Sequence, residues 1–328
     1  MKKSTKTLLA SLVATLMIPG VVLAQTTWKI GWTTTDSSDD PYAIAAHAFG
    51  DALKAKTNDQ VQLQYYPNRQ LGDEKQMLEG LRFGTVDAAV ITNAVVAQLD
   101  PSFELNDLPF LYSNAKHAHE VLDGPVGQEL AKRLDAKGVV VLGFTEGGFR
   151  HMLNNKRAVS SPADVQGVKY RVMQNPVFID MFGSLGGSAV PMAWGETFTA
   201  VQQGTIDGLE IPLAVAAGNK YYEVTKFLSL TGHTYSTNLL LVSKRAFSKL
   251  TPEQQDQVRE AGRQATQAQR QKSAENDAAL RKVMADNGMN VNEVADTAAF
   301  RQAVAPVYKK YGPRIGQELL DQVLNSSK

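Results

Sequence analysis

Two arginines stand where a solvated surface charge is not expected. Arg171 lies inside the apolar run 168–173 (Val-Lys-Tyr-Arg-Val-Met), and Arg150 follows the glycine pair Gly147-Gly148 on an extended segment. A guanidinium is planar, permanently charged and able to fork onto a carboxylate, so in a cleft it would bind an organic anion. The pattern leaves two interpretations of Arg171 open: an exposed charge on an edge strand, or a cation in a binding cleft.

The sequence contains no assembled catalytic or metal-binding motif. It has no cysteine, no His-Glu-x-x-His, no P-loop and no Gly-x-Ser-x-Gly. The lack of cysteine excludes disulfides, thiolate metal sites, a cysteine nucleophile and iron–sulfur clusters. His117 and His119 are two residues apart on a predicted helix and point to different faces, so we expect them to be solvated and to bind no metal. These observations weaken an enzymatic interpretation, and we expect no cofactor.

The charge balance indicates that any anion site must be local. The chain has 328 residues, with 34 Lys and Arg against 33 Asp and Glu, and a formal net charge of +1. A chain this close to neutral has no long-range positive field, so we expect no general binding of nucleic acid. The length predicts two domains, and the 43% of hydrophobic residues can supply a core for each.

Residues 1–24 have the three regions of a secretory signal peptide. Three lysines within the first six residues precede the apolar run 8–18, and Ala24 ends a small-residue cleavage site. The apolar run is too short to span about 30 Å of hydrocarbon. We therefore expect cleavage after Ala24, export to the periplasm and no membrane insertion of the mature protein. Because the chain lacks cysteine, we also expect no lipid anchor at the cleavage site.

Strand and helix patterns alternate along the mature chain. Strands are predicted at 28–32, 61–66 and 87–91, with helices beginning near residues 41 and 72. This order predicts βαβ units and a mostly parallel α/β sheet.

Ligands in such sheets bind beyond the carboxyl ends of the strands. That rule places the segments around Thr33, Glu74 and Asn93 at a candidate cleft. The same alternation recurs in residues 148–232, which predicts the core of a second α/β domain.

Residues 252–287 predict one long helix. Thr251 is a suitable N-cap, and only Gly262 interrupts the pattern. The helix is mostly polar, so it is not a core helix, and its poor heptad seam favours a bridge across two domains over a coiled coil.

Several sequence blocks resemble a known family. They are the run 168–173 around Arg171, the segment Pro191-Met192-Ala193-Trp194, and the run 200–212, which includes Asp207-Gly208-Leu209-Glu210-Ile211-Pro212. Together they make the chain similar to the substrate-binding proteins of tripartite ATP-independent periplasmic (TRAP) transporters of the DctP type. The resemblance covers essentially the whole mature chain.

The resemblance implies a two-lobed α/β periplasmic binding protein fold that closes on a small organic acid and then docks on the TRAP membrane permease subunits. One lobe would comprise 25–147 with about 233–272, and the other 148–232 with about 273–328. The long helix 252–287 would span both.

The resemblance also implies site residues. Arg171 matches the family's signature arginine, which pairs with the substrate carboxylate, and Arg150 matches a second arginine of many members. Cleft or pocket positions are matched by Glu74, Asn93, Gln174, Asn175, Trp194 and His233. One position departs from the family: Ile211 stands where many members have an asparagine that contacts ligand.

The identity of the anion stays open between two classes. A sugar acid of the uronate or aldonate class needs polar partners for its hydroxyls, whereas a C4-dicarboxylate needs a second cationic region. Because an acidic Glu74 in the cleft would oppose a second carboxylate, we favour the sugar acid. A function of another class, a periplasmic lyase or hydrolase acting on a carboxylated sugar, would use Glu74 and His233 as acid and base.

Overall fold

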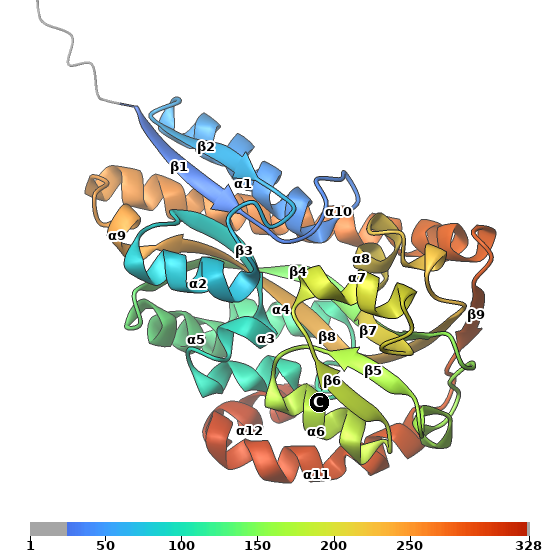
Figure 1. Cartoon of the computed structure of the whole chain (residues 1–328). Coiled ribbons are helices and arrows are strands. Elements are labelled where there is room, and N and C mark those ends of the chain that lie inside the picture. The colour runs from blue at the N-terminus through green and yellow to red at the C-terminus, as the bar shows by residue number, and fades with distance from the viewer. Residues whose placement is uncertain (1–24, 327–328) are drawn as a thin grey trace, which may run out of the picture.

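The computed structural model describes residues 25–326, so the predicted signal peptide, residues 1–24, lies outside the described residues. The chain forms one mixed sheet with helices on both faces (Figure 1). No helix in the described range is long and apolar enough to cross a membrane.

The first part of the chain alternates strands and helices as predicted. Its elements are β1 (Thr26–Gly31), α1 (Pro41–Thr57), β2 (Val61–Tyr66), α2 (Glu74–Phe83), β3 (Ala88–Thr92), α3 (Asn93–Val96), the 3-10 helix η1 (Pro101–Asp107), α4 (Ala115–Asp123), α5 (Pro125–Asp135) and β4 (Val139–Asn154).

The middle of the chain repeats the alternation. Its elements are η2 (Pro162–Val165), β5 (Lys169–Val172), α6 (Pro176–Ser184), β6 (Ser188–Pro191), α7 (Trp194–Gln202), β7 (Gly208–Pro212), α8 (Leu213–Gly218), η3 (Tyr221–Glu223) and β8 (Phe227–Ser243). The remainder is mainly helical, with α9 (Lys244–Phe247), α10 (Pro252–Asp286), β9 (Asn290–Glu293), α11 (Ala298–Ile315) and α12 (Gln317–Ser326).

The sheet has two parallel groups of strands joined by two long antiparallel strands. Its order is β2-β1-β3-β8-β4-β7-β5-β6, with β9 also paired to β8. β1 is parallel to β2 and β3, and β5 is parallel to β6 and β7. We call the end with β1–β3 lobe I and the end with β5–β7 lobe II. The two-lobed α/β prediction is confirmed, and the strands β4 and β8 run through both lobes.

Irregular backbone lies where β4 and β8 pass between the lobes. The β4–β8 register shifts between Glu146 and Gly148 and again between Arg150 and Met152. Gly148 and Gly232 have φ values of 94° and 53°, which are conformations that favour glycine. The predicted lobe boundaries, after residues 147 and 232, fall at these positions and remain a prediction. The final helix, α12, packs against α4 and α5 of lobe I, although residues 273–328 are assigned to lobe II in that division.

Alternating residues of β3 contribute to two apolar cores on opposite faces of the sheet. Ala88 and Val90 of β3 join one core with α1 and α10, whereas Ala89 and Ile91 join the other with α2 and α4–α6. Successive side chains of a strand point to opposite faces of the sheet, so neighbouring residues of β3 pack into different cores.

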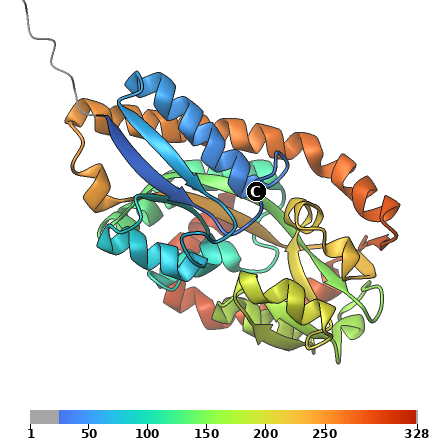
Figure 2. The ribbon, with the colours of Figure 1, turned by 45° about the horizontal axis from the view of Figure 1, so that its top comes forward.

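The long polar helix predicted at 252–287 is α10, which has 35 residues and would extend about 52 Å at 1.5 Å per residue. Figure 2 shows it crossing the molecule beside α1 (blue). Its first half buries Val258, Ala261 and Ala265 against lobe I, and it also contacts α8 and β9. The bridging interpretation is therefore confirmed.

We expect Gly262→Ala to destabilise the fold, because the added Cβ would lie 2.6 Å from Leu142 Cβ and 3.0 Å from its carbonyl oxygen, on strand β4. Overpacking of this kind costs about 1–3 kcal/mol. Gly183→Ala in α6 is the matched control, since its Cβ would meet nothing within 4 Å. Urea unfolding should show a loss for the first variant and no loss for the second; equal stabilities would contradict the close packing of α10 on β4.

Candidate functional site

A small cavity of about 30 Å³ lies between the lobes, where strands of both parallel groups end. Residues that follow β1 line it from lobe I, and residues that end or follow β5 and β7 line it from lobe II. The lining comprises Thr33, Thr34, Tyr42, Glu74, Arg150, Arg171, Met173, Trp194, Ile211, Pro212 and Val215. A cavity therefore lies where the rule that ligands bind beyond the carboxyl ends of strands predicts a cleft.

Arg171 is a buried cation at this cavity. Its strand β5 is paired on one side to β6 and on the other to β7, and the residue is 2% exposed, so the edge-strand alternative is wrong. Its Nε and Nη2 donate to the carbonyl of Met192 at 2.9 and 2.7 Å, and Nη1 approaches Met173 Sδ at 3.4 Å. No ion pair joins Arg171 to a carboxylate in the described part of the chain. Burial lowers the pKa of Arg171, which marks a guanidinium short of compensating charge.

Arg150, in contrast, is already paired with an acid. Its Nε and Nη2 fork onto the carboxylate of Glu210, with Nη2 at 2.9 Å from Oε1, and Nη1 donates to Ser236 Oγ at 3.2 Å. Glu210 is fully buried and lies beside His233, whose Nε2 is 3.4 Å from Glu210 Oε2. Burial alone would raise the pKa of Glu210, but Arg150 and His233 hold it below its usual value. Sequence reasoning missed Glu210 as the partner of Arg150.

Glu74 brings a second carboxyl group into the cavity. It is the first residue of α2, and its Oε1 accepts the backbone N–H of Thr92 at 2.8 Å. Burial raises the pKa of Glu74 to about 7, and the Thr92 hydrogen bond, Arg171 and Arg150 offset only part of that shift. At neutral pH the negative charge of Glu74 is therefore only partly present.

The first turns of three helices also supply residues to the lining: Tyr42 from α1, Glu74 from α2 and Trp194 from α7. Asp40 caps α1 by accepting hydrogen bonds from the N–H groups of Tyr42 and Ala43, which fixes the position of the first turn of α1. Helix N-termini carry partial positive charge, so these three add to the arginines in favouring an anion.

Four of the predicted pocket residues do not line the cavity. Asn93 donates to the Phe103 carbonyl at 2.8 Å and accepts from Asn106, so its amide is used within lobe I. His233 is fully buried beside Thr231 and Glu210, and burial lowers its pKa. The ligand contacts predicted for both residues remain predictions.

The other two, Gln174 and Asn175, lie where the lobes meet. The Asn175 side chain caps α6 and donates to Ala94 O and Asp107 Oδ2, at 3.1 and 3.0 Å. The backbone carbonyl of the exposed Gln174 accepts from Gln98 at 3.0 Å. In this structure both residues contribute contacts between lobes.

The lining also includes residues that sequence reasoning did not select. Tyr42, Met173 and Val215 are among them, and Ile211 was singled out only as a departure from the family. A usable signal was present for Tyr42, because it directly follows the Asp40-Pro41 helix start, where the connection from the predicted strand 28–32 ends.

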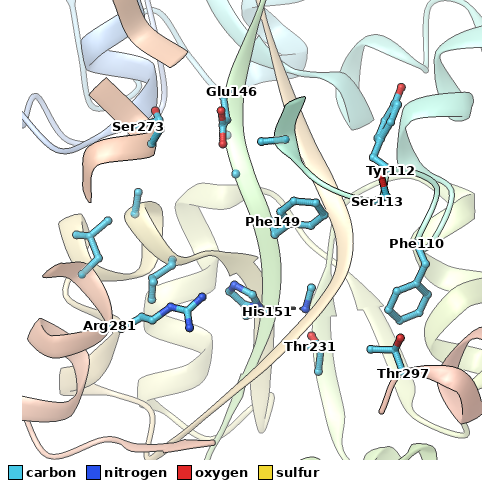
Figure 3. A pocket seen from close by; sticks show the side chains of 18 of the residues that line it. Phe110, Tyr112, Ser113, Glu146, Phe149, His151, Thr231, Ser273, Arg281 and Thr297 are labelled. Carbon is cyan, nitrogen blue, oxygen red and sulfur yellow. Dashed lines mark hydrogen bonds between the residues drawn. The ribbon is translucent and has the colours of Figure 1, made fainter. Parts of the chain in front are cut away.

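A larger cavity, of about 470 Å³, lies on the opposite face of β4 (Figure 3). Phe149 and His151 line it, whereas Arg150 between them lines the interlobe cavity, as strand alternation requires. Its arginines already have partners: Arg281 pairs with Glu293 at 2.9 Å, and Arg301 donates to the Phe110 carbonyl at 3.1 Å. The larger cavity is therefore a weaker anion site than the small one.

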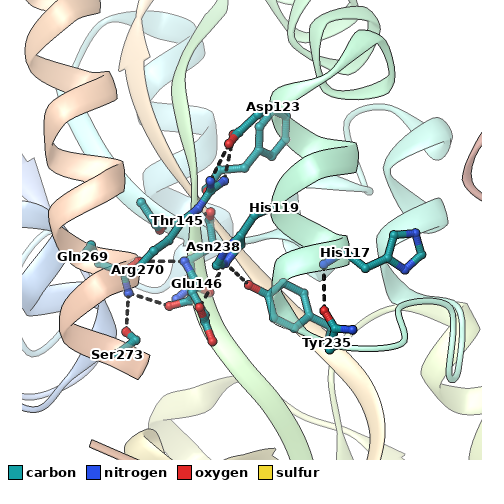
Figure 4. A network of polar contacts seen from close by, with 12 residues as sticks. His117, His119, Asp123, Thr145, Glu146, Tyr235, Asn238, Gln269, Arg270 and Ser273 are labelled. Carbon is teal, nitrogen blue, oxygen red and sulfur yellow. Dashed lines mark hydrogen bonds and ion pairs between the residues drawn. The ribbon is translucent and has the colours of Figure 1, made fainter. Parts of the chain in front are cut away.

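A polar network anchors α10 at the crossing between the lobes (Figure 4). Gln269 accepts from the backbone N–H of Glu146 and donates to its carbonyl, at 2.8 and 2.7 Å. Arg270 binds Asp123 and the Phe144 carbonyl.

The expectation of two solvated histidines is wrong. His119 contacts Glu146 and Tyr235, each at 3.0 Å, and His117 is buried beside Ser113 and Ser326. In the described range, no group of three or more acidic or histidine side chains is placed to hold a metal ion.

Comparison with known proteins relates this chain to a family. The family model for bacterial extracellular solute-binding protein, family 7 (DctP) matches residues 33–313. A solute-binding protein of Verminephrobacter eiseniae is 38% identical over 92% of this chain and 89% of its own length. The 2,3-diketo-L-gulonate-binding periplasmic protein YiaO of Escherichia coli is 36% identical over 86% and 85% of the two chains.

Solved structures agree with the sequence comparisons. A TRAP periplasmic solute-binding protein from a Polaromonas species, bound to D-erythronate, superimposes with a TM-score of 0.89, with 37% identity over 92% of this chain and 98% of that one. One from a Sulfitobacter species with bound β-D-galacturonate gives 0.87, with 34% identity over 92% and 100%. One from Sulfurospirillum deleyianum with bound succinate gives 0.86, with 28% identity over 92% and 98%.

The matched length and the superpositions establish the family. The chain belongs to bacterial extracellular solute-binding protein family 7, the DctP family.

Proposed function

We propose that this protein captures a sugar acid of the uronate or aldonate class in the periplasm, after removal of residues 1–24, and delivers it to a TRAP membrane permease. Arg171 carries the proposal, because a guanidinium this buried without a carboxylate partner in the described part of the chain is stabilised when a ligand supplies one. The ligand carboxylate would lie against Arg171, with Arg150 beside it as the already paired second guanidinium.

The choice of a sugar acid has two supports. The relatives nearer in sequence carry D-erythronate and β-D-galacturonate, while the succinate-bound structure is less similar, at 28% identity. Glu74 opposes a second carboxylate, and Thr33, Thr34 and Tyr42 offer hydroxyls to a polyhydroxylated chain.

Closure of the two lobes provides the capture step. The irregular crossings at Gly148 and Gly232 are suited to a hinge, and α10 is anchored to one side of it through Gln269. Contacts such as Asn175 with Asp107 join the lobes across the cleft. A ligand that touches both lobes favours the closed arrangement by its extra affinity for it, and exclusion of water strengthens its ion pair with Arg171.

Arg171→Ala should weaken binding of glucuronate by about 100-fold or more in titration calorimetry, since two charge-assisted hydrogen bonds contribute about 1.5–3 kcal/mol each. Arg171→Lys is the informative partner variant, because it keeps the charge but loses the fork, and its affinity should fall between the two. Thermal unfolding without ligand checks that each variant folds. Near-wild-type affinity of a folded Arg171→Ala protein would overturn the assignment.

Glu74 should make selectivity depend on pH. As pH rises from 6.5 to 8.5 through the raised pKa of Glu74, about 7, its growing negative charge should weaken succinate binding relative to glucuronate. Both ligands remain largely ionised over this range because carboxylic acids have pKa values near 4. Glu74→Gln should improve the relative affinity for succinate and flatten its pH dependence. The same succinate-to-glucuronate ratio in both proteins at all pH values would remove this ground for choosing the sugar acid.

A further inference from the structure

A second cavity, of about 230 Å³, continues the interlobe cavity outward. It shares Thr33 and Trp194 with the inner cavity, and its other lining residues are Asn68, Arg69, Gly195, Phe198, Asn219 and Tyr221. Asn68 and Arg69 come from the loop after β2 in lobe I, and Gly195 comes from the first turn of α7 in lobe II. This outer cavity is therefore built by both lobes.

The loop that carries Arg69 is held in a defined shape. Asn68 and Arg69 both have left-handed backbone conformations, with φ values of 52° and 62°. Their N–H groups donate to the carbonyls of Thr34 and Trp32, at 3.0 and 3.1 Å, directly after β1. Two successive non-glycine residues in this region cost energy, so the surrounding bonds must determine the shape.

Arg69 reaches across to the other lobe. A Cβ placed on Gly195 would lie 1.7 Å from Arg69 Nη1 and 2.5 Å from its Cζ, so the guanidinium occupies the space beside this glycine. Gly195 does not have a left-handed φ, and therefore the approach of Arg69, not backbone freedom, is what excludes a side chain there. In the described residues, neither an ion pair nor a side-chain hydrogen bond engages the Arg69 guanidinium.

The two volumes limit how a ligand can lie. At about 10–15 Å³ per water-sized probe, the inner cavity of about 30 Å³ has room for a group the size of a carboxylate. The rest of a longer acid must then extend past Trp194 into the outer cavity, where Arg69 offers N–H donors to oxygen atoms.

We propose that Arg69 and Gly195 form a distal subsite, in which the Arg69 guanidinium binds the far oxygen atoms of six-carbon sugar acids and so selects them over four-carbon acids. This inference rests on the proposed function. It requires the ligand carboxylate to bind at Arg171, and it makes Arg69 the residue that discriminates between ligands by the length of their carbon chain. The far oxygen can belong to a hydroxyl group or to a second carboxylate held beyond the reach of Glu74.

The test measures affinity by calorimetry for three probes: erythronate with four carbons, galactonate with six, and galactarate with six and a carboxylate at each end. Arg69→Ala should weaken galactonate or galactarate by about tenfold and erythronate by less than about threefold. A larger loss for galactarate assigns the far oxygen to a carboxylate, and equal losses for the two six-carbon acids assign it to a hydroxyl. Arg157→Ala, an exposed arginine of lobe II outside both cavities, is the charge-matched control and should leave all three affinities unchanged.

A double-mutant cycle tests the contact itself. Gly195→Ala should weaken all three acids, because its methyl group displaces Arg69 and obstructs closure. In the Arg69→Ala background the same substitution should have little further effect, since the obstructing guanidinium is gone. Additive losses would show that Gly195 does not act through Arg69 and would overturn the subsite.

The outcomes separate the two proposals. If wild-type protein binds none of the three acids, the distal subsite fails, and the proposed function fails as well if glucuronate also does not bind. If it binds them and Arg69→Ala has no effect, or weakens the four-carbon and six-carbon acids equally, the distal subsite fails and the proposed sugar-acid function stands.

Discussion

The structure depends on a cation that the fold buries without neutralising. Arg171 and Arg150 lie at one cavity, and both are almost fully buried, yet within the described residues only Arg150 forms an ion pair with an acid, Glu210. Burial of an unpaired guanidinium costs several kcal/mol even after relaxation, so it persists only where the rest of the fold compensates. Here the Met192 carbonyl satisfies part of the guanidinium and leaves its charge available. The remaining deficit is what an organic anion can relieve.

In the proposed function, the architecture around Arg171 links anion binding to closure of the two lobes. β4 carries Arg150, which lines the cavity, and β4 and β8 together form the irregular crossing at Gly148 and Gly232. The proposed binding site and the proposed hinge therefore share strand β4. Gln269 fixes α10 to this crossing, and the long, mostly polar helix is therefore attached to the strands that pass between the lobes.

The periodicity of the sequence predicted the elements well and the side-chain partners poorly. Strand ends and helix starts follow from local patterns, so the segments around Thr33 and Glu74 could be placed at the cleft, whereas for Arg171 the pattern left an exposed edge-strand charge open. The fork of Arg150 onto Glu210 depends on the antiparallel register of β4 with β7, which no local pattern encodes. Asn93 and Asn175 lie at the right strand ends, but their amides are used by nearby polar groups and a helix cap. Which way a short polar side chain turns is decided by tertiary contacts.

The contrast between Glu210 and Glu74 explains how an anion site can contain carboxyl groups. Arg150 keeps Glu210 ionised and neutralises its charge, so the pair presents little net charge to a ligand. Glu74 forms no ion pair in the described part of the chain; burial favours its neutral form and raises its pKa to about 7, although Arg171 and Arg150 offset part of the shift. A neutral carboxyl group can donate a hydrogen bond to a hydroxyl oxygen, whereas an ionised one repels a second carboxylate. The buried Arg171 guanidinium beside a carboxyl group with a raised pKa therefore suits a ligand that has one carboxylate and several hydroxyl groups.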